Sequence, residues 1–310
     1  MSHSHPSTVL SQLILPTVQV LQGQRAAFLG CGDSLAAARP AEDFGHRVLS
    51  AGDVAWSELA PRGVDVAVAL SWSGRTGATI KAAETVVKAG MPLISITSNG
   101  DSPLARMSTT HFTAPSFEFT EDIPAIGYAV HSAMIRNLLG LGEPVRSFQP
   151  IADAWGAGSA DAVATARAAG TERPEGITIA STADTRGAAE FWMLKIIEAT
   201  GLTVRTAPLE EIGHVDYFIG AQPHVTFILA GDDKHERSLG LGQALERNGQ
   251  RVVQVSAAEF APTSTVLDRE LITGLLGADV AAELSTMWER PHFRDHAVDM
   301  SARHIQVQGY

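Results

Sequence analysis

Short apolar runs alternate with helix-length segments along most of this chain, and this alternation limits the possible folds more than any other feature. The run Val66–Leu70 contains only Val, Ala and Leu, which is typical of a strand buried on both faces. A helical pattern follows it from Gly77 to Ala89. Strands that alternate with helices of about 10 to 15 residues predict a parallel sheet covered by helices on both faces. The expected fold class is therefore α/β.

The second half of the chain repeats the plan of the first. The apolar run 177–180 takes the place of the strand expected at 25–29. The run 225–230 likewise corresponds to Val66–Leu70. We expect a tail and a helix over 1–20 (the helix from Val9 to Leu21), a first domain over 21–145, a linker over 146–174, a second domain over 175–290 and a C-terminal tail over 291–310.

Composition excludes several classes of protein. With 45% apolar and 18% charged residues, a soluble globular chain is expected. No apolar run approaches the roughly 20 residues of a membrane span, and the start lacks the pattern of a signal peptide. Cys31 is the only cysteine, so no internal disulfide is possible and a cytoplasmic location is expected. A formal charge of −11 argues against broad nucleic-acid binding, but not against a phosphorylated small molecule.

The turn between the strand at 66–70 and its helix has the residues of an anion site. It reads Ser71-Trp72-Ser73-Gly74-Arg75-Thr76. The first turn of a helix offers unpaired backbone N–H groups and the positive end of the dipole. Three hydroxyl side chains add donors, and Gly74 allows the backbone to approach a ligand. We interpret the turn as a phosphate cradle; the alternative is an ordinary capped connection between strand and helix.

Two other loops could face a ligand. Gly30-Cys31-Gly32-Asp33-Ser34 follows the first strand and opens a helix; there Cys31 is interpreted as a small strand-end residue, because no histidine is near it in sequence. The equivalent of the phosphate turn in the second half contains acids instead. Its Asp232, Asp233, His235 and Glu236 fit no metal-binding spacing, so a solvated turn and no metal are expected.

A third group of residues suits proton transfer. Lys195 and Glu198 are three residues apart, so they share one face of a predicted helix. His214 follows sixteen residues after Glu198, in Glu211-Ile212-Gly213-His214. A carboxylate can remove a proton next to a carbonyl, a cation stabilises the oxyanion, and a histidine exchanges protons near neutral pH. The alternative is a surface Lys–Glu pair and an unrelated histidine at a strand end.

The turn at 71–76 resembles the sugar-phosphate loop of the sugar isomerase (SIS) domain, and the loop at 30–34 resembles that domain's first ligand loop. The doubled layout resembles proteins with two SIS domains. These are the isomerase part of glucosamine-6-phosphate synthase, the fructosamine-6-phosphate deglycases and the amino-sugar-phosphate deaminase/isomerases. The resemblance covers about residues 20–290 and includes the Leu-Lys-x-x-Glu helix followed by the histidine. It implies two tandem SIS-type domains, each a parallel sheet flanked by helices.

The resemblance also implies a role for each group. Glu198 corresponds to the base that moves a proton between C1 and C2 of an open-chain sugar, Lys195 to the lysine beside the enediolate, and His214 to the acid/base that opens the ring or protonates the leaving group. Family members form homodimers in which the histidine comes from the neighbouring subunit, and no cofactor is implied. The implied phosphate-binding residues are Ser34, Ser71, Ser73, Thr76, Gly32, Gly74 and Trp72.

Several departures leave the substrate open. The chain has four lysines and none in the tail, so the Schiff base of glutamine-dependent synthesis is not expected. Trp72 stands where the synthase has glutamine, and Ala78 where many relatives have an acid. The expected activity is a phosphosugar isomerase, deglycase or deaminase acting on a hexose 6-phosphate or its amino derivative. Candidates for the side of the site away from the phosphate are Trp72, Glu121, Tyr217 and Arg294.

Two alternatives remain. A non-catalytic sugar-phosphate-binding regulator would keep the phosphate loop without needing Glu198 and His214. A nucleotide-binding enzyme of the Rossmann type would need a third glycine after Gly30 and Gly32, where this chain has Leu35. No helix-turn-helix with a basic recognition helix is evident at either end, which disfavours a DNA-binding regulator.

Overall fold

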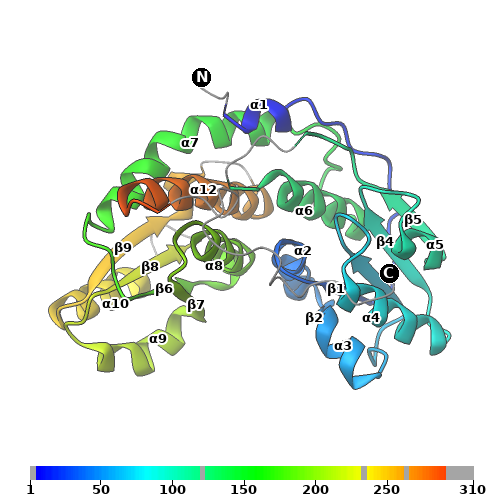
Figure 1. The fold of residues 1–310 in the computed structure, drawn as a ribbon, viewed down its shortest axis with the longest axis horizontal. Coiled ribbons are helices and arrows are strands. Elements are labelled where there is room, and N and C mark those ends of the chain that lie inside the picture. The colour runs from blue at the N-terminus through cyan, green and yellow to red at the C-terminus, as the bar shows by residue number, and fades with distance from the viewer. Residues whose placement is uncertain (1–4, 119–122, 232–235, 262–264, 291–310) are drawn as a thin grey trace. The chain divides into compact units, whose positions relative to one another are not determined.

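The chain forms two parallel sheets, each flanked by helices (Figure 1). The structure is a computed structural model that describes residues 5–118, 123–231, 236–261 and 265–290. Two compact units divide these residues. The amino-terminal unit comprises 9–118 and 126–149, and the carboxy-terminal unit comprises 5–8, 123–125 and the described residues from 150 onward.

The amino-terminal unit is built on a five-stranded parallel sheet of order β2-β1-β3-β4-β5. Every residue of β1, β3 and β4 is buried, as their apolar composition predicts. In register, Phe28 of β1 lies beside Val68 of β3. The strands are β1 (Ala26–Gly30), β2 (Arg47–Ser50), β3 (Val66–Leu70), β4 (Leu93–Thr97) and β5 (Thr110–Thr113).

Helices cover both faces of this sheet, because successive side chains of a strand point to opposite sides. One set, which includes Ala27, Ala69 and Leu93, packs with residues of α3, α4 and α5. On the other face, α2 packs against α6. The helices are α2 (Asp33–Ala38), the 3-10 helix η1 (Arg39–Phe44), α3 (Ala51–Ser57), α4 (Gly77–Lys88), α5 (Pro103–Met107) and α6 (Ile126–Leu139).

The strand order places both candidate ligand loops at one point of the sheet. The chain leaves β1 toward β2 on one side and returns to β3 on the other side of β1. The connections that follow β1 and β3 therefore diverge and leave a crevice beyond the carboxyl ends of these strands, where ligands of such folds bind. The loop after β1 is Gly30–Ser34, and the loop after β3 is Ser71–Thr76.

The carboxy-terminal unit has a four-stranded parallel sheet of order β7-β6-β8-β9, the same order as the first four strands of the other sheet. This order confirms that the second half repeats the first. The elements are α7 (Gln149–Ala168), β6 (Gly176–Ser181), η2 (Ala183–Thr185), α8 (Arg186–Thr200), β7 (Thr203–Pro208), α9 (Leu209–Val215), η3 (Asp216–Ile219), β8 (His224–Ala230), α10 (Glu236–Arg247), β9 (Arg251–Ser256), α11 (Ala257–Phe260) and α12 (Val266–Met287).

The helix predicted over Val9–Leu21 is wrong beyond its first residues. The helix α1 covers Ser7–Leu10 only. Pro16 has no backbone N–H, and its ring disfavours the helical conformation at Leu15. Leu15 N instead donates to the carbonyl of Arg146 at 3.0 Å, beside a bridge between Ile14 and Ser147.

The C-terminal helix is longer than predicted. The sequence pattern predicts a helix from Asp268 to Leu276, yet α12 continues to Met287. Gly277 weakens the helical signal but has a packing role, because a Cβ there would overlap the indole of Trp192 on α8. Trp192 Nε1 also donates to Thr273 O at 2.7 Å. The glycine therefore allows α12 to lie against α8.

Two glycine substitutions should change stability in opposite directions. Gly277→Ala should lower the free energy of unfolding by about 2 kcal/mol, since the added Cβ would overlap the indole of Trp192, which is fully buried. Gly240→Ala, in α10, meets nothing within 4 Å and should raise it by up to about 1 kcal/mol through helix propensity. Urea unfolding of the full chain measures both. Equal effects of the two substitutions would contradict the packing role of Gly277.

Candidate functional site

The Ser71–Thr76 loop brings hydroxyl groups together at the end of β3. Gly74 N donates to Ser71 O at 3.1 Å and closes a tight turn. This turn places Ser71 Oγ 3.0 Å from Thr76 Oγ1, in a shared hydrogen bond. Ser73 is exposed, and its Oγ accepts from Arg75 N at 3.2 Å. The loop thus presents several hydroxyl groups within one turn of chain.

Gly74 is required by the shape of the loop. Its φ is +63°, a left-handed conformation that favours glycine. A Cβ at this position would also overlap the Oγ and Cβ of Ser102, the residue that caps α5. The backbone of the loop therefore passes directly against the start of α5.

The loop leads into the amino end of α4, a helix of 12 residues. Thr76 is the N-cap of α4 but makes no side-chain capping bond, since its hydroxyl is shared with Ser71. The first intrahelical bond is made by Ile80 N, which donates to Thr76 O at 3.0 Å. Backbone N–H groups of the first turn, with the positive end of the helix dipole, suit an anion.

The loop after β1 contributes Gly32 and Ser34. Gly32 has a φ of +56° and is the N-cap of α2. Ser34 is buried in the first turn of α2, and its Oγ lies 3.2 Å from Nδ1 of His131 on α6. His131 is 2% exposed. Burial lowers the pKa of His131 to about 4, so its imidazole is neutral at pH 7.

Trp72 connects the second loop to the same histidine. Its indole lies edge-on to the His131 ring at 5.7 Å between centroids and packs on Phe117 at 5.0 Å. A Cβ on Gly127 of α6 would lie 3.5 Å from the indole. Trp72 O accepts from Ser98 N at 2.9 Å and from Ser98 Oγ at 2.8 Å. The Trp72 side chain is therefore packed between the loop and α6.

Sequence reasoning missed His131. Its contact with Ser34 joins residues 97 positions apart, and no local pattern predicts such a distance. The only available signal was a single histidine on an otherwise apolar face of the helix at 126–139.

Lys195 and Glu198 form an ion pair on α8. Lys195 Nζ donates to Glu198 Oε2 at 2.8 Å. The lysine side chain is 1% exposed and that of the glutamate 35%. Lys195 Nζ also lies 5.1 Å from the centre of the Phe191 ring. A fully buried ammonium group is thus held against a carboxylate that reaches solvent.

His214 lies on α9, in the same unit as that pair, with an exposed side chain. The chain after it is fixed by the buried carboxylate of Asp216, which pairs with Arg205. Gln250 Nε2 donates to Asp216 O at 2.6 Å. The contacts of Asp216 therefore fix the chain just after His214, while the imidazole of His214 itself is exposed.

The equivalent point in the carboxy-terminal unit is occupied by a carboxylate. Thr182 Oγ1 donates to Asp184 Oδ1 at 2.6 Å and accepts from Gly231 N at 3.0 Å. A Cβ on Gly231 would overlap the Asp184 carboxylate. A negative charge at this crevice disfavours phosphate, so the two halves of the chain differ in chemistry although they share a plan.

Some predicted residues lie outside the described ranges. These are Asp232, Asp233, His235, Glu121, Arg294 and the tail from 291. Within the described ranges, no group of at least three His, Cys, Asp or Glu residues could hold a metal ion. Among the helices of these ranges, none is long and apolar enough to cross a membrane.

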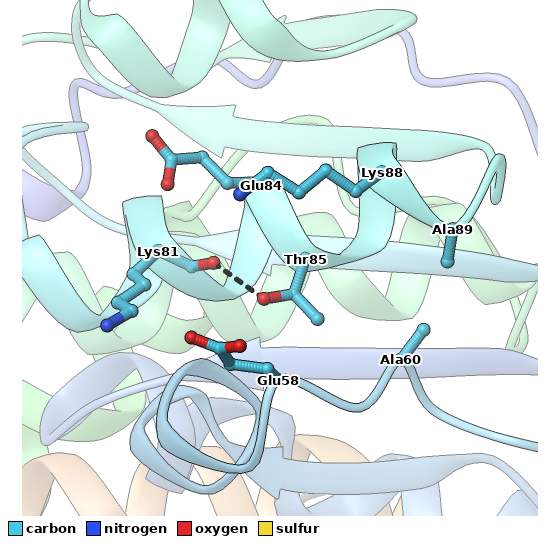
Figure 2. A pocket seen from close by; sticks show the side chains of 7 residues that line it. All are labelled: Glu58, Ala60, Lys81, Glu84, Thr85, Lys88 and Ala89. Carbon is cyan, nitrogen blue, oxygen red and sulfur yellow. Dashed lines mark hydrogen bonds between the residues drawn. The ribbon is translucent and has the colours of Figure 1, made fainter.

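A separate pocket of about 310 Å³ lies beside α4 (Figure 2). Thr85 Oγ1 donates to Lys81 O at 3.1 Å on its wall. Its lining consists of Glu58, Ala60, Lys81, Glu84, Thr85, Lys88 and Ala89. Two lysines and two glutamates balance in charge, and this lining contains no predicted site residue.

Comparison with known proteins supports the fold, and part of the chain matches a family model. Residues 61–136 match the family model of the SIS domain, a range that includes the Ser71–Thr76 loop. The bifunctional protein glk of Paraburkholderia xenovorans (strain LB400) is 32% identical over 146 residues, which make up 44% of this chain and only 22% of that protein.

Solved structures share the fold at low sequence identity. Glucosamine-6-phosphate deaminase from Thermotoga maritima superposes with a TM-score of 0.73 at 16% identity and covers 92% of both chains. Tagatose-6-phosphate ketose/aldose isomerase from Escherichia coli gives 0.72 at 15% identity, over 92% of this chain and 86% of that one. The predicted α/β fold and the resemblance to the SIS domain are thus confirmed.

His131 should give the fold a specific pH dependence. Its folded pKa of about 4 lies below the ordinary 6.5, so between these values the unfolded chain binds a proton that the folded chain does not. Stability therefore falls as the pH falls through this window. Between pH 7 and pH 4.5 wild type should lose about 2 kcal/mol more than His131→Asn, which cannot titrate. Urea unfolding at both pH values measures this, and an equal loss in both proteins would contradict it.

Proposed function

We propose that this chain, whose residues 61–136 match the family model of the SIS domain, acts on a hexose 6-phosphate or its amino derivative by moving a proton between C1 and C2 through an enediol or enediolamine. The observation that favours an enzyme over a binding module is the Lys195–Glu198 pair. Proton transfer needs a carboxylate base, which a binding module does not, and here the Glu198 carboxylate reaches solvent 2.8 Å from the buried Lys195 ammonium group. We keep the proposed domain limits of 21–145 and 175–290.

The phosphate is proposed to bind at the Ser71–Thr76 loop. The clustered hydroxyl groups and the amino end of α4 support this placement. Gly74 and Gly32 allow the backbone to approach the ligand, and the Trp72 side chain connects the loop to α6 through its contact with His131. The other proposed donors are Ser34, Ser71, Ser73 and Thr76.

The proton transfer is assigned to Glu198. Its carboxylate accepts the proton from C2 of the open-chain aldose (or from C1 of a ketose), the C–H electron pair forms the C1–C2 double bond, and the carbonyl π pair moves to the carbonyl oxygen. The hydroxyl proton of the neighbouring oxygen passes to that oxygen, the new carbonyl forms, and the carbon-bound proton returns to the neighbouring carbon. The Lys195 ammonium group stabilises the negative charge that develops on that oxygen. His214 opens the ring or protonates a departing amine. Isomerisation, deglycation and deamination share this first half, and water completes the last two.

We also propose that a second copy of the chain covers the surface around His214. The neighbouring side chains are large, apolar and exposed: Val215 is 53%, Tyr217 48% and Phe218 75% exposed. Such a cluster is typical of a surface that another chain covers. In a homodimer, His214 of one copy would complete the site of the other.

Hydrogen exchange at C1 or C2 tests the proposal. In heavy water, wild type should exchange the C2 proton of glucose 6-phosphate and one C1 proton of fructose 6-phosphate or of an amino derivative such as fructosamine 6-phosphate. Glu198→Gln should slow the exchange at least about 100-fold, because an amide cannot accept the proton. The control is Glu246→Gln, an exposed position on α10, which should behave as wild type. Binding of these sugars without any exchange would instead favour a regulatory protein.

Mixing two inactive variants tests the shared site. Glu198→Gln and His214→Asn should each be inactive as homodimers. If His214 acts in the partner's site, a mixed dimer regains one intact site, and random mixing should restore about a quarter of wild-type activity. Activity is measured after joint unfolding and refolding of equal amounts. An absence of recovery, with mixed dimers present by mass spectrometry, would place both residues in the same copy's site.

A further inference from the structure

His131 joins the two loops of the proposed phosphate site. It reaches Ser34 of the first loop through a hydrogen bond of 3.2 Å and Trp72 of the second loop through an edge contact of 5.7 Å between rings. All three residues belong to the amino-terminal unit. One side chain of α6 therefore holds α2 and the Ser71–Thr76 loop together.

The ring of His131 is only partly satisfied. Its Nε2 is buried and has no hydrogen-bond partner among the described residues. Neighbouring residues of α6 are apolar and buried, including Val130 and Met134. A hydrophobic residue would fill this space without a buried polar atom left unpaired, and such an atom is costly. Packing alone thus does not account for a histidine here.

The unpaired Nε2 indicates which tautomer is present. A neutral imidazole carries one N–H, and a buried N–H without an acceptor is rarer and more costly than an unpaired lone pair. The proton therefore lies on Nδ1, and Nδ1–H donates to Ser34 Oγ. Ser34 in turn must point its own hydroxyl hydrogen away from His131. That hydrogen is then available to an anion in the crevice beyond β1 and β3.

We infer that His131 is a positioning residue for the phosphate group of the substrate: it orients the Ser34 hydroxyl as a donor and fixes the loop of Trp72. The inference rests on the proposed function, since it concerns the same phosphate site. His131 itself does not touch the ligand, because its ring is buried.

Two variants separate orientation from packing. His131→Asn keeps a polar group where Nδ1 lies, whereas His131→Leu keeps the volume and loses the hydrogen bond. At pH 7, His131→Leu should weaken binding of inorganic phosphate and of fructose 6-phosphate by about tenfold, the effect of one lost hydrogen bond. His131→Asn should bind within about threefold of wild type, because its amide can still orient Ser34. Isothermal calorimetry measures both.

The matched control is another histidine–serine pair in the same unit. His111 Nδ1 lies 2.9 Å from Ser95 Oγ, on β5 and β4. His111→Leu removes a similar bond and should leave phosphate affinity unchanged. Equal losses in His111→Leu and His131→Leu would overturn the inference, since both would then act through general stability.

Nitrogen NMR of ¹⁵N-histidine-labelled wild type tests the tautomer independently of any variant's folding. Nδ1 of His131 should be protonated and Nε2 unprotonated, with and without phosphate. The opposite tautomer would overturn the inference. If wild type binds the probes but His131→Leu binds them equally well, the inference fails and the proposed function stands. If wild type binds none of them, the proposed function fails and the inference with it.

Discussion

The reversal of strand order around β1 is the constraint on which the site depends. Because β2 and β3 lie on opposite sides of β1, the connections after β1 and β3 run in opposite directions, and the region beyond the carboxyl ends of these strands is where ligands of such folds bind. Both strands are buried along their whole length. The buried strands therefore position the side chains that follow them in the sequence.

The same plan occurs in both halves, with different residues at the equivalent point. Ser71 and Thr76 place hydroxyl donors after β3, whereas Asp184 places a carboxylate against Gly231 after β8. Backbone geometry alone therefore does not create a phosphate site. The carboxy-terminal unit instead carries the Lys195–Glu198 pair on α8 and His214 on α9. The two halves thus share a plan and differ in the side chains at their strand ends, and the proposed division is between anion binding in one half and proton transfer in the other.

Local features of the sequence predicted the Ser71–Thr76 loop and the Lys195–Glu198 pair. They did not predict contacts between residues that are far apart in the sequence. The loop at 71–76 follows directly from an apolar strand and precedes a helical pattern, so its position was predictable. The 195/198 pair followed from helix geometry. His131 was not predictable, because its partner Ser34 is far away in sequence. Apolar spacing alone favoured a helix through Pro16, whereas the helix α1 ends before it. Gly277 suggested the end of a helix, whereas α12 continues through it because the glycine leaves room for Trp192.

The most direct test of the phosphate site is a titration of the ¹⁵N-labelled chain with fructose 6-phosphate, followed by backbone amide shifts. If the amino-terminal unit holds the phosphate, the largest shifts should fall on Ser34 and on the loop and first turn of α4, residues 73–79. Residues 181–185, which correspond to the Gly30–Ser34 loop in the other half, should not move. Shifts centred on 181–185, or on the pocket lined by Lys81 and Lys88, would contradict this account of the molecule.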